Sequence, residues 1–93
     1  MSTSEIPTPV RELLAAVLEA IDLPMPDITE TDERRAAAVQ RDRTRVAAIV
    51  TRGVLERGHD PGHGAAYLRR RVAEVPADYC PWTGPQQGGG EGR

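Results

Sequence analysis

The sequence predicts an all-α fold, a small three-helix assembly with a long central helix and a disordered C-terminal tail. Apolar residues recur at helical spacing in three segments, proline or glycine separates these segments, and no stretch alternates apolar and polar residues as a half-buried strand does. A chain of 93 residues is long enough for one small domain. We therefore predict a flexible N-terminus over residues 1–8, a single helical domain over residues 9–82 and a disordered tail over residues 83–93.

The first helix is predicted over residues 9–22. Thr8 is a suitable N-cap, and Pro9 fits the first helical position, where a backbone donor is not needed. Pro24 and Pro26 end the helix because each lacks a donor and forces extended geometry on the residue before it. The apolar side that we expect to face the core consists of Val10, Leu13, Leu14, Val17, Leu18 and Ile21. An apolar strap to the next helix is expected from Leu23, Met25 and Ile28.

The second helix is predicted over residues 32–57. Thr29 or Thr31 supplies its cap, and acidic residues in the first turn suit the positive end of the helix dipole. At 1.5 Å per residue the helix is roughly 39 Å long, so we expect it to form the spine of the fold. Gly53 within it predicts a bend or a close helix contact.

The stretch "RGHDPGHG" at residues 57–64 combines two histidines and an aspartate with three glycines. Gly58 is a helix stop, and Asp60 before a proline is a helix start, so we interpret the stretch as a corner leading into a third helix over residues 61–75. The apolar side of this helix consists of Ala65, Leu68, Val72 and Val75.

Two functional alternatives for this corner are weaker. His59 and His63 with Cys80 form an incomplete zinc set, because such a site needs three or four ligands and no paired-cysteine motif exists. A phosphate on the amides of residues 62–64 would compete with Asp60 for the helix N-terminus. We therefore predict no metal and no cofactor.

Four arginines of the long helix, Arg34, Arg41, Arg45 and Arg52, fall within about 40° of one another, opposite the valines of the core side. We call them the basic stripe; it is about 27 Å long. A solvated face and a binding site for an anionic partner both remain open interpretations. Arg43 instead lies in the middle of the apolar face. Its guanidinium should reach water or an acid such as Asp22 or Asp27, or else that face is a subunit boundary.

Tyr79 and Trp82 lie in a proline-bracketed extended stretch after the third helix. They either fold back as a lid over the core, which we favour for so small a chain, or anchor a partner. Cys80 between them is expected to be an inert thiol.

The order "VRELLAAVLEAIDLP", a long Arg-rich helix, "DPG" before "YLRRRVAEVP" and a tail with Tyr79 and Trp82 resembles a group of small actinobacterial proteins of unknown function, often encoded by prophages or integrative elements. The resemblance covers residues 10–82 and implies a genetic setting. It carries no catalytic motif.

Composition narrows the function. One cysteine cannot form an internal disulfide and the N-terminal segment has no apolar run of signal or anchor length, so we expect a cytoplasmic chain without membrane contact. Paired catalytic carboxylates, an activated nucleophile and a phosphate loop are lacking, so we predict no enzyme. The favoured function is a protein-interaction module with a partner of unknown identity. It could self-associate as a homodimer through alanines on the long helix: Ala36, Ala37, Ala47 and Ala48.

The alternative is a small nucleic-acid-binding regulator that uses the basic stripe or Arg69–Arg71. A net charge of −2 and the residues Gly62 to Ala65 at the start of the third helix, which are poor readers of base edges, make nucleic acid the less favoured partner.

Overall fold

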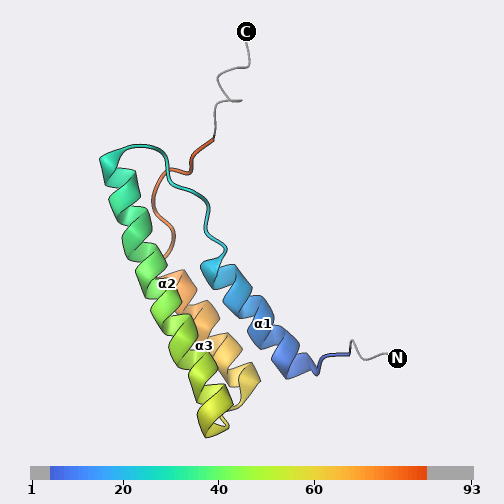
Figure 1. The fold of residues 1–93 in the computed structure, drawn as a ribbon. Helices are drawn as coiled ribbons and strands as arrows, with labels where there is room; N and C mark the ends of the chain where they lie inside the picture. Colours follow the sequence, from blue (N-terminus) through green and yellow to red (C-terminus); the bar gives the residue numbers. More distant parts are fainter. Residues whose placement is uncertain (1–4, 84–93) are drawn as a thin grey trace.

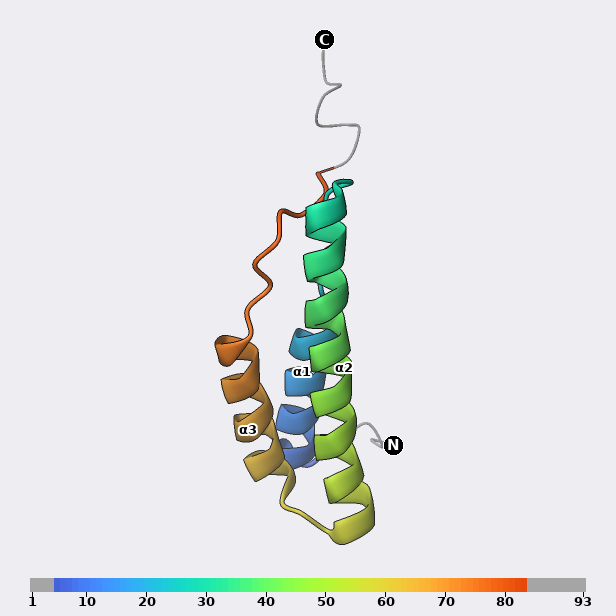
Figure 2. The same ribbon diagram turned by 90° about the vertical axis from the view of Figure 1, so that its left-hand side faces the viewer.

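The computed structural model describes residues 5–83. They form three helices, α1 (Thr8–Ile21), α2 (Glu30–Arg57) and α3 (Pro61–Glu74), and within this range the only β-type pairing is one isolated bridge. Helices that are consecutive in sequence run antiparallel, with α3 lying across one side of the α1–α2 pair (Figures 1 and 2). The predicted all-α fold with a long central helix is confirmed. The termini predicted to be flexible or disordered fall mostly on residues 1–4 and 84–93, outside the described range.

α1 begins one residue earlier than predicted. Pro7 occupies the cap position with φ −54 and ψ 143, and no side chain caps the helix. The first turn closes through Arg11 N, which donates to Pro7 O at 2.9 Å. The predicted Thr8 cap is therefore wrong, because the fixed φ of Pro7 places that residue at the boundary and makes Thr8 the first helical residue.

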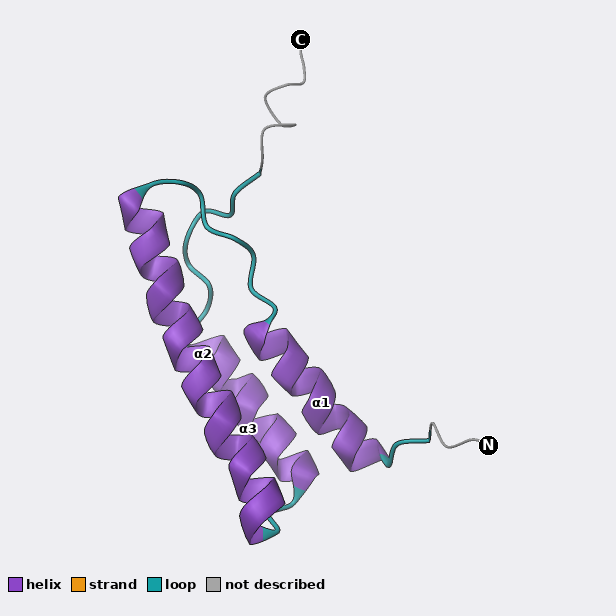
Figure 3. Ribbon diagram, in the orientation of Figure 1, coloured by secondary structure: helices purple, strands orange, loops and turns teal. Residues whose placement is uncertain are grey.

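The caps of α2 and α3 are local and agree with the sequence. The Thr29 hydroxyl accepts from Asp32 N at 3.0 Å, so α2 begins two residues earlier than predicted. Gly58 ends α2 in the left-handed region at φ 68, which suits a residue without a side chain. The Asp60 carboxylate accepts from His63 N at 2.8 Å and starts α3 after a short corner (Figure 3).

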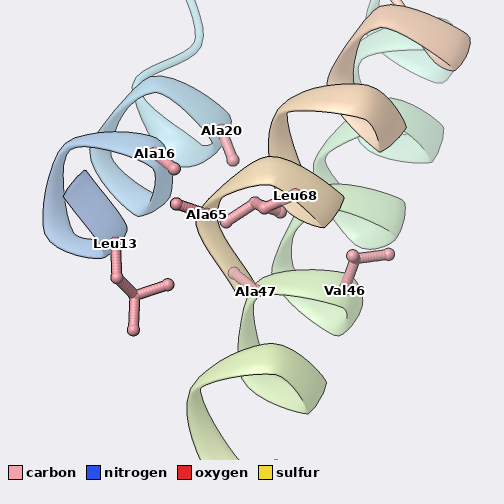
Figure 4. Packing of buried hydrophobic residues seen from close by; sticks show 7 residues of the cluster. All are labelled: Leu13, Ala16, Ala20, Val46, Ala47, Ala65 and Leu68. Carbon is pink, nitrogen blue, oxygen red and sulfur yellow. The ribbon is translucent and has the colours of Figure 1, made fainter. Parts of the chain in front are cut away.

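The main core is small and rich in alanine. It is formed by Leu13, Ala16 and Ala20 of α1, Val46 and Ala47 of α2, and Ala65 and Leu68 of α3 (Figure 4). Gly64 permits the close approach of α3, because a Cβ there would lie 2.8 Å from Val50 Cγ1. Among the large side chains described, Leu68 alone is less than 2% exposed. The helices therefore approach closely while burying few large side chains.

Arg43 joins the ends of two helices. It is 3% exposed, and its guanidinium donates to Ala20 O at 2.9 Å and to Val75 O at 2.8 and 3.3 Å. The expectation that it reaches water, Asp22 or Asp27 is wrong, as is the idea that this face is a subunit boundary. The negative ends of α1 and α3 converge here and supply the acceptors.

A second cluster joins the chain after α3 to the loop after α1. Tyr79 packs on Ala36 and Val39, with Leu23 against them, and its hydroxyl donates to Pro24 O at 2.6 Å. Two backbone hydrogen bonds also join these segments: Trp82 N donates to Met25 O at 2.7 Å, and Asp27 N donates to Cys80 O at 2.8 Å. The predicted strap is only partly correct, because Met25 and Ile28 are 65% and 76% exposed.

None of these helices combines the length and the apolar character needed to cross a bilayer within the described range.

Candidate partner-binding surfaces

The basic stripe is half neutralised. Arg34 pairs with Glu30 at 2.8 Å and Arg52 approaches Glu56 at 4.0 Å, both one turn away on the same helix. Arg41 and Arg45 are exposed and make no ion pair within residues 5–83. They border a shallow hollow of about 430 Å³ that also includes Ala37, Gln40 and Thr44. The free positive charge on this face is therefore concentrated in two arginines at its centre.

Arg69 fastens α3 to α1. Its guanidinium donates to Glu12 Oε1 at 2.8 Å and to Glu19 Oε1 at 3.1 Å. Its hydrogen bonds, first to the carboxylate of Glu19 and then to that of Glu12, stabilise the charged form and raise the pKa of Arg69 above its ordinary value. This arginine contributes to helix packing and is not a free cation for a nucleic-acid backbone.

The other two arginines of residues 69–71 also make contacts within the chain. Arg71 binds Asp42 at 2.7 Å, linking α3 to α2, and its hydrogen bond lowers the pKa of the Asp42 carboxyl. Arg70 lies over the ring of Tyr67, 5.6 Å from its centroid. The positive charge that made residues 69–71 a candidate nucleic-acid site is largely engaged in contacts within the chain.

The structure separates the two candidate aromatics. Tyr79 is 7% exposed and covers the second cluster, whereas Trp82 is 43% exposed beyond it. Trp82 is thus the one of the pair with surface available to a partner.

A groove between α2 and α3 at the corner adds residues that the sequence analysis missed. It has a volume of about 570 Å³, and its walls include Ile49 from α2 and Tyr67 from α3. These side chains are 54% and 48% exposed, and Val50 and Val54 form the apolar floor between them. The walls come from positions 18 apart on two helices, so no pattern within one segment could have identified the groove.

The rim of this groove is basic. Arg57, His59, His63 and Arg70 surround it, while the carboxylate of Asp60 is engaged as the cap of α3. His59 lies against Gly53, where a Cβ would come within 2.6 Å of its Nδ1, which explains the glycine inside α2. An apolar floor with a basic rim suits an acidic segment that carries a large apolar side chain.

The three residues weighed as zinc ligands do not meet. His59 follows the last turn of α2, whereas Cys80 N donates to Asp32 Oδ1 in the first turn at 3.1 Å. The helix from Asp32 to its last residue, Arg57, spans about 38 Å. Within residues 5–83, no three side chains of His, Cys, Asp or Glu are grouped as a metal site requires.

Comparison of the chain with protein-family models, with curated proteins and with solved structures gave no match, so its likeness to small actinobacterial, mobile-element proteins stays a prediction.

Proposed function

We propose that the chain is a non-enzymatic protein-interaction module whose groove between α2 and α3 binds an acidic segment of a partner protein. The observation that carries the proposal is the exposure of Ile49 and Tyr67, each about half, on the two walls of one groove with a basic rim. A cytoplasmic location belongs to the proposal and is supported by the single cysteine.

The residue types at the groove support this function. Tyrosine and arginine are enriched where binding energy concentrates in protein interfaces, and Tyr67 and Arg70 already stack on each other at its edge. Their mutual contact reduces the side-chain freedom that binding would remove. Arg57 is exposed and makes no ion pair within the described residues, so it is available to a carboxylate of the partner.

The test is capture from the native host with the full chain as bait, with nuclease treatment and identification by mass spectrometry. We expect a partner that is retained by the wild type and lost with Ile49→Glu. Ile28→Glu is the matched control, because Ile28 is a large apolar residue just before α2 that is 76% exposed and does not line the groove. A partner captured equally by both variants would contradict the assignment of the groove.

A second candidate is a nucleic-acid-binding regulator. Arg41 and Arg45 favour it, since they are free of ion pairs among the described residues and stand beside Gln40 and Thr44, whose polar side chains suit phosphate oxygens. The engagement of Arg69 and Arg71 in ion pairs supports the protein partner over this alternative.

A further inference from the structure

The apolar side of α1 is wider than the core that it meets. Leu13 is buried, and Val10 and Val17 are half-buried, as expected for the core side. The other three large apolar residues are instead 53%, 60% and 50% exposed: Leu14, Leu18 and Ile21. Their four- and three-residue spacing places them on one continuous strip, which we call the α1 stripe.

The α1 stripe faces away from α3. Ala16 and Ala20 point into the core shared with α3 (Figure 4), and Glu12 and Glu19 bind Arg69 of that helix. At 100° per residue, the centre of the stripe lies about 130–170° from these four positions. The stripe therefore lies on the open side of the α1–α2 pair, which is opposite α3 in Figure 1.

We propose that the α1 stripe of one chain packs against the α1 stripe of a second copy, with the two helices antiparallel. The charges beside the stripe select this occupant. Arg11 and Asp22 lie on the same flank, within about 20° in projection, and both are exposed. Neither makes an ion pair within residues 5–83, in contrast to Glu12 and Glu19.

Antiparallel packing pairs these unused charges. When Leu14 faces Ile21 of the partner subunit, Arg11 lies within about two residues, or 3 Å along the axis, of Asp22 of the partner subunit. The two-fold axis repeats the pair at the other end of the interface. In parallel packing the two-fold axis runs along the helices and places this flank on opposite sides of the seam in the two chains, so the charges stay unpaired.

The neighbouring face of α2 accommodates a second α1 without burying charge. It lies next to Ala47 of the core in projection and consists of Gln40, Thr44, Ala48, Thr51 and Leu55. The sequence predicted a homodimer contact through alanines of α2. A dimer has to use the α1 stripe instead, because Ala36 and Ala47 are buried in the core of their own chain.

The proposed dimer depends on the proposed function only because both describe the chain as an interaction module. The α1 stripe and the groove are separate surfaces. With Leu14 facing Ile21 of the partner subunit, the two helices overlap over residues 14–21, or about 12 Å. Such a contact belongs at the small end of interface sizes, below about 1,200 Å², so the dimer should dissociate in the micromolar range.

Sedimentation of the full chain over a concentration series up to about 0.5 mM tests the pairing. We expect a reversible monomer–dimer equilibrium, with dimerisation weakened at least about 100-fold by Leu18→Glu. Ile49→Glu is the matched control, since it places the same charge on a residue with similar exposure in the groove and should leave the dimer intact. Circular dichroism verifies that both variants stay helical.

Charge exchange tests the antiparallel orientation. Arg11→Glu and Asp22→Arg should each weaken the dimer about tenfold, and the double variant should restore it. A wild type that stays monomeric throughout the series, or a dimer that survives Leu18→Glu, would overturn the proposal. Single reversals without effect, or a double variant without rescue, would overturn the antiparallel pairing. Loss of the captured partner with Ile49→Glu alongside an intact dimer would separate the two surfaces.

Discussion

Arg43 brings a full positive charge to the junction of all three helices, where backbone carbonyls take the place of a carboxylate. The acceptors belong to Ala20 and Val75, at the C-terminal ends of α1 and α3. Each helix end carries a partial negative charge, so the two ends together offset much of the charge on the guanidinium. One planar side chain thereby fixes the positions at which both short helices end against the long one.

Arg43→Met tests this junction, because methionine keeps the apolar stem and removes the donors. The two carbonyls would lose their partners in a buried position, and we expect the free energy of unfolding to fall by about 2 kcal/mol or more. Chemical denaturation gives the value. Arg45→Met, on the exposed side of the same helix, should change it by no more than about 0.5 kcal/mol; equal losses in the two variants would contradict the role of Arg43.

Gly64 offers a second test at the scale of one residue. Gly64→Ala raises helix propensity, yet its Cβ would lie 2.8 Å from Val50 Cγ1 and push α3 away from α2. We expect a net destabilisation of about 1–3 kcal/mol in thermal or chemical unfolding. At Gly62 the nearest atom to an added Cβ is an oxygen of Asp60 at 3.2 Å, so Gly62→Ala should be milder. A stabilised Gly64→Ala variant would show that the helices do not pack this closely.

At the scale of elements, the segment after α3 is held to the start of α2 by Asp32. Its carboxylate accepts from Cys80 N and from the Thr29 hydroxyl, and these hydrogen bonds, the one from Cys80 first, lower the pKa of Asp32 below 3.8. A lowered pKa stabilises the folded contact above the ordinary carboxyl value. The stabilisation is lost as pH falls through the folded pKa.

The fluorescence of Trp82, the single tryptophan, reports on this segment. We expect the emission to be constant above about pH 5 and to change below pH 3.8, while the helical circular dichroism signal distinguishes release of the segment from unfolding. Asp32→Asn should remove most of this acid transition. An identical acid transition in the variant would assign the change to another carboxyl group, with Asp42 the first to examine because its pKa is also lowered.

The elements that the sequence predicted well are those decided locally. Thr29, Gly58 and Asp60 act within one turn of themselves, so the two caps and the stop could be identified from neighbouring residues. The contacts that were missed join distant residues, as Arg43 joins Val75 and Tyr79 joins Pro24. Their acceptors are backbone carbonyls, which every residue possesses and which therefore leave no mark in the sequence.

The same distinction applies to the candidate surfaces. Helical projection placed the four arginines of the basic stripe on one face, and acidic residues four positions away accounted for the partial neutralisation of Arg34 and Arg52. Projection also assigned Leu14, Leu18 and Ile21 to the core side of α1. They remain exposed because α3 and α2 together cover a narrower arc than the apolar residues span.

For the whole molecule, two features determine how strongly the surface attracts a polyanion such as DNA. These are the net charge of −2 and the ion pairs that Arg69 and Arg71 form within the chain. Each phosphate neutralised on duplex DNA contributes about −0.9 to the slope of log K against log salt. A fully available basic stripe would give roughly −3 to −4, whereas the two free arginines give about −2. So few contacts on an acidic protein should not hold DNA at physiological ionic strength.

We therefore expect fluorescence anisotropy to show no binding of the wild type to labelled duplex DNA at about 0.15 M salt, with any binding at low salt following the shallower slope. Arg41→Glu combined with Arg45→Glu should abolish that residual binding, while Arg34→Glu, which alters an arginine already paired with Glu30, should weaken it much less. Micromolar affinity of the wild type at about 0.15 M salt, lost in the folded double variant, would make the regulator the better account of the molecule. If the wild type does not bind DNA under the same conditions and retains a partner after nuclease treatment, the basic stripe is either solvated or in contact with a protein surface.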